Sequence, residues 1–172
     1  MRDVAAIVEL LNRAHLQFLE ACEQFPANRW KKPPAKGGWS AGEVVAHLTM
    51  VESYVWNAAR EELSKKVPQH SFWQRMHLPV SIVAVRLAKR KTPIPLDATL
   101  VKARPEALES YSSARNRTLK FITEQSSRNL APYRRKHPFL GSLNLYDWLR
   151  MLAYHEMRHT KQIQEIGKSF EK

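Results

Sequence analysis

The chain has 172 residues, of which 44% are hydrophobic and 26% are charged; this composition excludes disordered and low-complexity proteins and predicts one packed domain over residues 1–172. The single cysteine, Cys22, excludes an internal disulfide bond and a cysteine-based zinc site, and it fits a reducing compartment, so a cytoplasmic protein is expected. The 28 Lys and Arg outnumber the 16 Asp and Glu, and the net charge of +12 favours anionic partners without choosing between nucleic acid, anionic lipid and a small anionic substrate.

The first predicted element is an amphipathic helix over residues 3–24. Val4, Leu11 and Phe18 recur at helical spacing and predict an apolar stripe along one side of it. Residues 25–39 contain three prolines and two glycines, which a helix does not accommodate. We therefore expect a linker there.

The second helix is predicted over residues 40–63, and several signals agree on where it starts. Ser40 is placed to cap the helix, and Glu43, three residues later, completes a capping box. Trp39, just before the cap, is placed to pack against Val44 as a hydrophobic staple. The local sequence alone therefore predicts the start of this helix.

The segment between Lys65 and Arg104 is interrupted by four prolines, and only residues 78–89 could form a helix in it. A crossover of this length suits two neighbouring helices that run in the same direction. Its longest apolar run is broken by Ser81 and Arg86 and is far too short to span a membrane. No membrane-spanning segment is expected.

Two further amphipathic helices are predicted in the second half of the chain. The third begins at Pro105 and ends near Gln125, with Arg115 inside its apolar stripe. A linker over residues 127–143 leads to Asn144, an N-cap residue with an acidic residue three positions later. Four amphipathic helices and no convincing alternating strand predict an all-α four-helix bundle, because each apolar stripe must be buried against the others.

The last helix carries a histidine pair, His155 and His159, whose spacing of four residues lets both bind one metal ion from the same face. With Glu156 the pair also matches HExxH, the motif of zincin metalloproteases. The extended form of that motif fails, because Gln162 stands in place of its glycine and Glu165 in place of its third histidine. A peptidase is therefore not favoured.

A third metal ligand is predicted on the second helix, where His47 lies on the core-facing side. Three imidazoles suit Zn²⁺, Ni²⁺ or Fe²⁺ better than Mg²⁺ or Ca²⁺, and they leave a coordination position open, as in catalytic sites. The alternative is that each histidine is a buried, hydrogen-bonded core residue. That alternative is preferred for His15, on the first helix.

Three charged residues are further candidates for the site. Glu156 is predicted as a general base or as a partner of a ligating imidazole, with an ordinary carboxylate beside the apolar seam as the alternative. Arg115 and Arg158 are predicted to bind an acidic group of a substrate. For Arg115 the preferred interpretation is a long side chain that extends from the edge of the bundle into water.

Two stretches of the sequence, 38–48 and 155–163, resemble the DinB/YfiT-like superfamily of four-helix metalloproteins. The resemblance implies a metal triad of His47, His155 and His159 and an up-down-down-up bundle. It also implies the chemistry of that superfamily, which includes bacillithiol S-transferases, mycothiol-dependent maleylpyruvate isomerases and hydrolases. The crossover segment matches no motif of the superfamily, so the resemblance does not identify a substrate.

The function predicted from these features is divalent-metal binding by a metal-dependent transferase or hydrolase that acts on small molecules. Zinc, nickel or iron and a low-molecular-weight thiol are the expected cofactors, and a homodimer is expected from the fold class alone. The alternative is a non-catalytic binding protein, associated with nucleic acid through its positive charge. The basic groups at 31–32, 86–91 and 134–136 form no continuous stripe, and the sequence has no helix-turn-helix, zinc-finger, RRM or KH motif, so nucleic-acid binding is not favoured.

Overall fold

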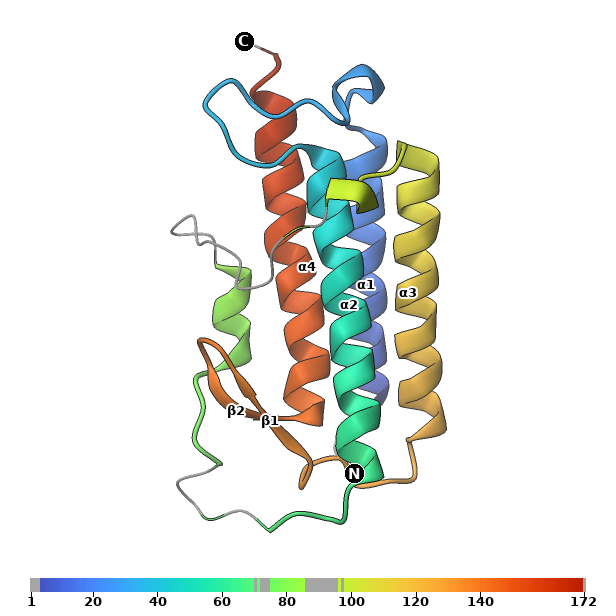
Figure 1. The fold of residues 1–172 in the computed structure, drawn as a ribbon, viewed down its shortest axis with the longest axis vertical. Coiled ribbons are helices and arrows are strands. Elements are labelled where there is room, and N and C mark those ends of the chain that lie inside the picture. Colours follow the sequence, from blue (N-terminus) through green and yellow to red (C-terminus); the bar gives the residue numbers. More distant parts are fainter. Residues whose placement is uncertain (1–3, 70, 72–74, 86–95, 97, 172) are drawn as a thin grey trace.

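Four long helices dominate the computed structural model, which describes residues 4–69, 71, 75–85, 96 and 98–171. They are α1 (Val4–Glu23), α2 (Ala41–Ser64), α3 (Arg104–Glu124) and α4 (Leu145–Lys168). In Figure 1, α1 and α4 run upward while α2 and α3 run downward, which is an up-down-down-up arrangement. The predicted all-α four-helix bundle is therefore confirmed.

The start of α2 has the capping box that the sequence predicts. Ser40 Oγ accepts a hydrogen bond from the backbone N–H of Glu43 at 3.3 Å, and Glu43 Oε2 accepts one from the backbone N–H of Ser40 at 2.7 Å. Trp39 packs against the apolar cluster that contains Val44, as the predicted staple requires. These contacts fix where α2 begins and hence the level of the bundle at which its side chains lie.

Replacing Ser40 by alanine is expected to lower the free energy of unfolding by about 1 kcal/mol, because the backbone N–H of Glu43 at the helix start loses its acceptor. Urea denaturation measures this change, provided that the unfolding free energy depends on urea concentration with the same slope in both proteins. Ser113→Ala, at an exposed position within α3, is the control and should change stability little. An equal effect of the two substitutions would contradict the capping role.

The core consists of two apolar clusters that follow one another along the bundle axis. The first includes Leu11, Val55 and Leu149, and the second includes Phe18 and Val44. Buried polar side chains lie near the junction of the two clusters, and we call them the polar layer: His47, Glu52, Arg115, Glu156 and His159. The most extensive helix contacts are those of α1 with α4 and of α2 with α3, and a smaller contact joins α2 to α4.

An antiparallel hairpin precedes α4. Its strands are β1 (Arg134–His137) and β2 (Gly141–Asn144). The sequence-based expectation of a linker without strands over residues 127–143 was therefore wrong. Each strand has only four residues, and the polar run of β1 lacks the apolar alternation that predicts a strand.

Contacts with distant residues hold the hairpin in place. Trp148 of α4 donates a hydrogen bond through Nε1 to the carbonyl of Arg135 at 3.2 Å. Gly141 has a φ of +89°, and a Cβ at this position would lie 3.0 Å from the carbonyl oxygen of Met76. Only glycine suits both the backbone conformation and the close approach. The hairpin therefore joins α4 to the crossover between α2 and α3.

The crossover contains a short 3-10 helix, η3 (Val80–Ala84), which packs against α4. Val85 follows it in an extended conformation, so the helix predicted over 78–89 is replaced by this shorter turn, and residues 86–89 lie outside the described residues. Among the described residues, 3-10 turns also occur at η1 (Ala27–Arg29) and η4 (Ala98–Leu100). None of the described helices is long and apolar enough to cross a membrane.

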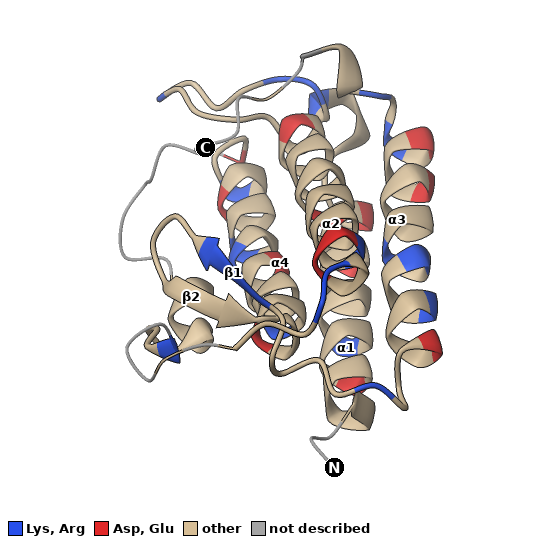
Figure 2. Cartoon of the chain, turned by 60° about the horizontal axis from the view of Figure 1, so that its bottom comes forward, with Lys and Arg blue, Asp and Glu red and all other residues tan. Residues whose placement is uncertain are grey.

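Acidic and basic residues both occur on the helices of the bundle. Figure 2 shows both kinds interleaved along α3, with basic residues on β1. Arg135 of β1 is itself paired with two acidic residues of α2, Glu61 at 2.8 Å and Glu62 at 3.5 Å.

Candidate metal centre

Three histidines converge in the bundle, His47 from α2 and His155 and His159 from α4. Nε2 of His155 lies 3.4 Å from Nε2 of His47 and 3.1 Å from Nε2 of His159. One ring nitrogen of each residue lies within 4.8 Å of those of the other two. The predicted convergence of these three side chains is therefore confirmed.

The helices explain this convergence. His155 and His159 lie one helical turn apart and so project from the same side of α4. Because α2 begins at Ser40 and runs against α4 (Figure 1), His47 reaches the level of this pair about two turns into its helix. The capping box and the spacing of four residues together bring three imidazoles to one place.

The spacing of the ring nitrogens fits a metal ion. A tetrahedral ion bound at about 2.0–2.1 Å by three imidazoles separates their nitrogens by about 3.3 Å, close to the 3.1 and 3.4 Å found here. Within the described residues, Nδ1 of His47 and Nδ1 of His155 are buried and have no hydrogen-bond partner. The proton positions of the three rings are therefore not fixed entirely by contacts within the chain.

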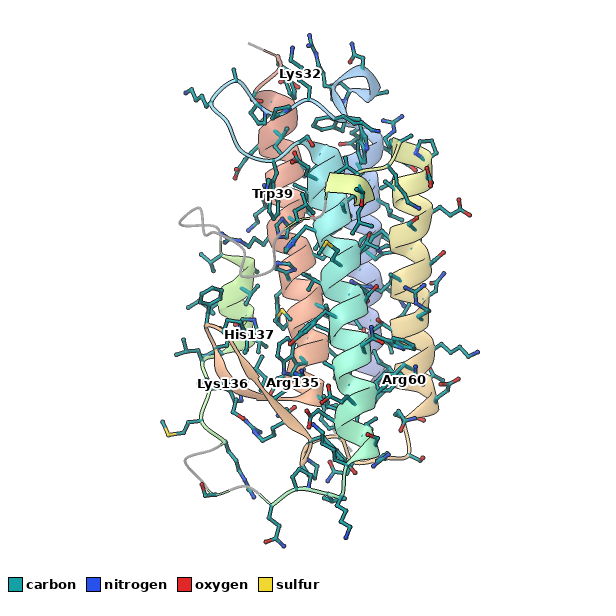
Figure 3. The ribbon with its side chains drawn as sticks, viewed as in Figure 1. Lys32, Trp39, Arg60, Arg135, Lys136 and His137 are labelled. Carbon is teal, nitrogen blue, oxygen red and sulfur yellow. The ribbon has the colours of Figure 1, made fainter. Side chains whose placement is uncertain are left out.

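Two neighbours orient the imidazoles. Gln162 Oε1 lies 2.9 Å from Nδ1 of His159, so this nitrogen carries the proton and Nε2 presents its lone pair to the cluster. The ring of Trp39 is stacked on His159 at 6.3 Å and lies 4.9 Å from His47. Figure 3 shows Trp39 along the upper half of the bundle. Trp39 thus has a second contact that its predicted role as a staple does not include.

Burial keeps the three imidazoles neutral near pH 7. It lowers the pKa of His47 to about 4 and that of His155 to about 3, and it holds the pKa of His159 well below its usual value. Neutral imidazoles have a free lone pair, which is the form that binds a metal ion. The site is therefore ready to bind a cation without first losing protons.

The free energy of unfolding of the metal-free protein is expected to fall between pH 7 and pH 5. Unfolded histidine takes up a proton near pH 6.5, whereas His47 and His155 in the folded protein resist it until about pH 4 and about pH 3. Stability is thus lost as the pH falls below the unfolded pKa, on the order of 1 kcal/mol for each residue. Urea unfolding with chelator at both pH values measures the loss, and His155→Gln should reduce it. An undiminished loss in that variant would contradict the assignment.

Arg158 and His137 lie near the cluster. The charge of each lowers the pKa of His155, although burial is the larger cause. Arg158 donates a hydrogen bond to the carbonyl of Val85, and its predicted role in binding an acidic group stays a prediction. His137 lies lower on the same side of the bundle as Trp39 (Figure 3), with its ring 5.2 Å from that of Trp148.

Sequence reasoning missed the proximity of His137 to this site. Its position in an apparent linker gave no ligand spacing, and only the hairpin brings it to α4. Its Nδ1 accepts hydrogen bonds from the backbone N–H groups of Phe139, at 3.1 Å, and Leu140, at 3.2 Å. The remaining proton is therefore on Nε2, which makes His137 a hydrogen-bond donor at this nitrogen.

Arg115 lies in the core and does not extend into water. Only 1% of its surface is exposed, so the interpretation of a side chain at the edge of the bundle was wrong. Its Nε lies 3.1 Å from Oε1 of Glu52, and its Nη2 lies 3.2 Å from Oε2 of Glu52 and 3.0 Å from Oε2 of Glu156. Its predicted role toward an acidic ligand stays a prediction, but the acidic groups it contacts are those of the chain itself.

Glu156 is completely buried and points into the polar layer. Its Oε1 accepts hydrogen bonds from Tyr111, at 2.7 Å, and from His15, at 3.0 Å. Ser112 lies 3.2 Å from the other ring nitrogen of His15, so His15 has partners at both nitrogens and lies outside the three-histidine cluster. The proposed catalytic role of Glu156 stays a prediction, and its oxygens contact Arg115, Tyr111 and His15 in this structure.

Comparison with known proteins finds a family match and a relative. A family model described as the DinB superfamily matches residues 10–163. The uncharacterized protein YuaE of Bacillus subtilis (strain 168) is 23% identical over 172 residues, an alignment that covers 96% of this chain and 99% of the relative. No solved structure matches the chain.

Proposed function

Since the chain belongs to the DinB superfamily, we propose that His47, His155 and His159 bind one divalent transition-metal ion and that the protein is a metal-dependent enzyme acting on small molecules. The observation that carries the proposal is the separation of 3.1 and 3.4 Å between the Nε2 atoms of three imidazoles from two helices. Their lowered pKa values support it, because neutral rings are competent ligands.

The donor set favours zinc, nickel or iron. Imidazole nitrogens suit these ions better than magnesium or calcium, which prefer oxygen ligands. Three protein ligands leave room for a further ligand, as in catalytic zinc sites. A bound ion of this kind supplies Lewis acidity, which lowers the pKa of a water or thiol ligand and makes it a better nucleophile.

The residues around the cluster contribute binding and orientation. Gln162 holds the ring of His159, and Trp39 lies against two of the three imidazoles. Arg158 lies within electrostatic range of His155 and favours a substrate with an acidic group. A low-molecular-weight thiol that carries carboxylates fits this environment, so thiol-dependent S-transfer is the reaction we favour, with hydrolysis as the second.

Purified protein is expected to hold about one transition-metal ion per chain, measured by elemental analysis of protein prepared without a histidine tag. A panel of electrophiles and esters, tested with and without a thiol and with and without a chelator, separates the two reactions. S-transfer requires both thiol and metal, whereas hydrolysis requires metal alone. Protein that neither contains a metal nor takes up Zn²⁺ or Ni²⁺ would contradict the proposal, and bound metal without turnover would restrict it to binding.

A further inference from the structure

The metal ligands come from two different helix pairs. The most extensive contacts join α1 to α4 and α2 to α3, while His47 is on α2 and the other two ligands are on α4. The distance between His47 and His155 therefore depends on how one pair is placed along the other. If one helix slides along another by a single residue, its side chains move by about 1.5 Å. A displacement of this size would disrupt the arrangement of the three ligating nitrogens.

A buried arginine crosses between these pairs next to the ligands. Arg115 of α3 contacts Glu52 of α2 through two nitrogens and Glu156 of α4 through one. Glu52 follows His47 by five residues, and Glu156 directly follows His155. Each carboxylate thus lies on the same helix as a ligand and close to it in the chain.

Further contacts extend this connection to the remaining helix. Arg115 Nη1 donates a hydrogen bond to the carbonyl of Leu11 in α1 at 3.2 Å. His15, one turn along α1, contacts Glu156 at 3.0 Å, and Tyr111 of α3 contacts the same oxygen at 2.7 Å. All four helices therefore meet in one hydrogen-bonded group of polar and charged groups.

Apolar contacts and buried charges constrain the helices differently. Apolar side chains can repack around a small slide of one helix against another at modest cost. A buried guanidinium between carboxylates has few acceptable arrangements, because each unpaired charge or donor is costly in the core. Buried polar residues fix the register of helices in other bundles for this reason.

We propose that Arg115 is a positioning residue for the three-histidine site, and that with Glu52 and Glu156 it fixes the α2–α3 pair against the α1–α4 pair and so sets the spacing of His47 from His155. This inference rests on the proposed metal-binding function. Arg115 itself touches none of the three imidazoles in the contacts described, so it acts through the two helices.

The test uses Co²⁺, whose visible absorption reports the number and geometry of its ligands. Arg115→Lys keeps the positive charge but replaces the planar guanidinium by a single ammonium group. An ammonium cannot make the paired contacts that the guanidinium makes with Glu52. Glu52→Leu, Arg115→Met and Glu156→Leu together replace the guanidinium and both carboxylates by apolar side chains, a kind of replacement that often leaves stability near that of the parent. We expect both variants to bind Co²⁺ at least about tenfold more weakly than the parent, with a changed absorption spectrum.

Ile122→Ala is the matched control, since Ile122 is buried on the same helix and its truncation destabilises the core without touching the carboxylates. This variant should keep the Co²⁺ affinity and spectrum of the parent. If the apolar triple variant fails to fold by circular dichroism, Arg115→Lys decides the question, together with Glu52→Gln, which keeps the shape of the side chain.

Two negative results are distinguishable. If the parent protein itself does not bind Co²⁺, Zn²⁺ or Ni²⁺, the proposed function fails. If the parent binds Co²⁺ and the folded Arg115 variants show the same affinity and spectrum, or if Ile122→Ala weakens binding as much as they do, the positioning role of Arg115 is overturned while metal binding stands.

Discussion

Alanine in place of His47 is expected to weaken Zn²⁺ or Ni²⁺ binding by more than about 100-fold, since the loss of a direct ligand should exceed the 10- to 100-fold cost of losing an outer partner. His47 lies over a hundred residues from His155 in the sequence, yet their Nε2 atoms are 3.4 Å apart. Two imidazoles on one helical turn are left in the variant. Isothermal titration calorimetry of protein stripped of metal measures the change in dissociation constant.

The alternative is that the two histidines of the HExxH motif bind the metal ion without a third histidine. It predicts that His47 is dispensable for metal binding. His77→Ala is the control, because this histidine is in the crossover and lies outside the three-histidine cluster. Circular dichroism establishes that both variants are folded. If His47→Ala binds the metal ion as tightly as the parent does, the alternative is correct and His47 is not a ligand.

Methionine in place of Arg115 is expected to lower the free energy of unfolding by about 3–5 kcal/mol, because breaking a buried ion pair leaves uncompensated charge in the core. Two buried carboxylates, Glu52 and Glu156, lose the positive charge that both of them contact. Urea unfolding at pH 7 measures the loss. Arg117→Met, on the exposed side of the same helix, should change stability by less than about 0.5 kcal/mol.

The pH dependence of this loss gives a second check. Burial raises the pKa of Glu52, against the opposing effect of Arg115. Without Arg115 that opposition is gone, and the carboxyl group takes up a proton more readily as the pH falls. Protonation removes the uncompensated charge, so the difference in stability between Arg115→Met and the parent should shrink from pH 7 to pH 5. A difference that grows over this range would contradict the assignment of the two carboxylates as partners of Arg115.

The features that sequence predicts well are those encoded by residues close together in the chain. Ser40 and Glu43 are three residues apart and mark the start of α2. His155 and His159 are four residues apart and share a helix face. Once both helices are placed with their apolar sides inward, the position of His47 follows, because a short-range pattern fixes its level along the bundle.

The partners of Arg115 could not be predicted in the same way. Along the sequence, Glu52 is 63 residues from Arg115 and Glu156 is 41 residues from it. The spacing within α3 shows only that Arg115 lies in an apolar stripe. A buried ion pair and a long side chain that extends past the edge of the bundle both satisfy that pattern, and only the packing of the other helices separates them.

The hairpin escaped prediction for a different reason. Its strands have four residues each, too few for a periodic pattern. The contacts that hold it come from Trp148 and from the crossover at Met76, neither of which is visible from its own residues. The position of His137 near the metal ligands depends on this hairpin and was missed with it.

The division of the core into two apolar clusters affects how long an ion would stay bound. Each end of the bundle is held by its own cluster, so either end can open locally, as helix termini do, without uncovering the cluster at the other end. On α4, His155 and His159 lie between the residues of the two clusters, whereas His47 lies beside Leu48 of the second cluster. Opening at the end held by the first cluster would therefore leave a bound ion covered, and the rate of its release would depend on how often the end held by the second cluster opens.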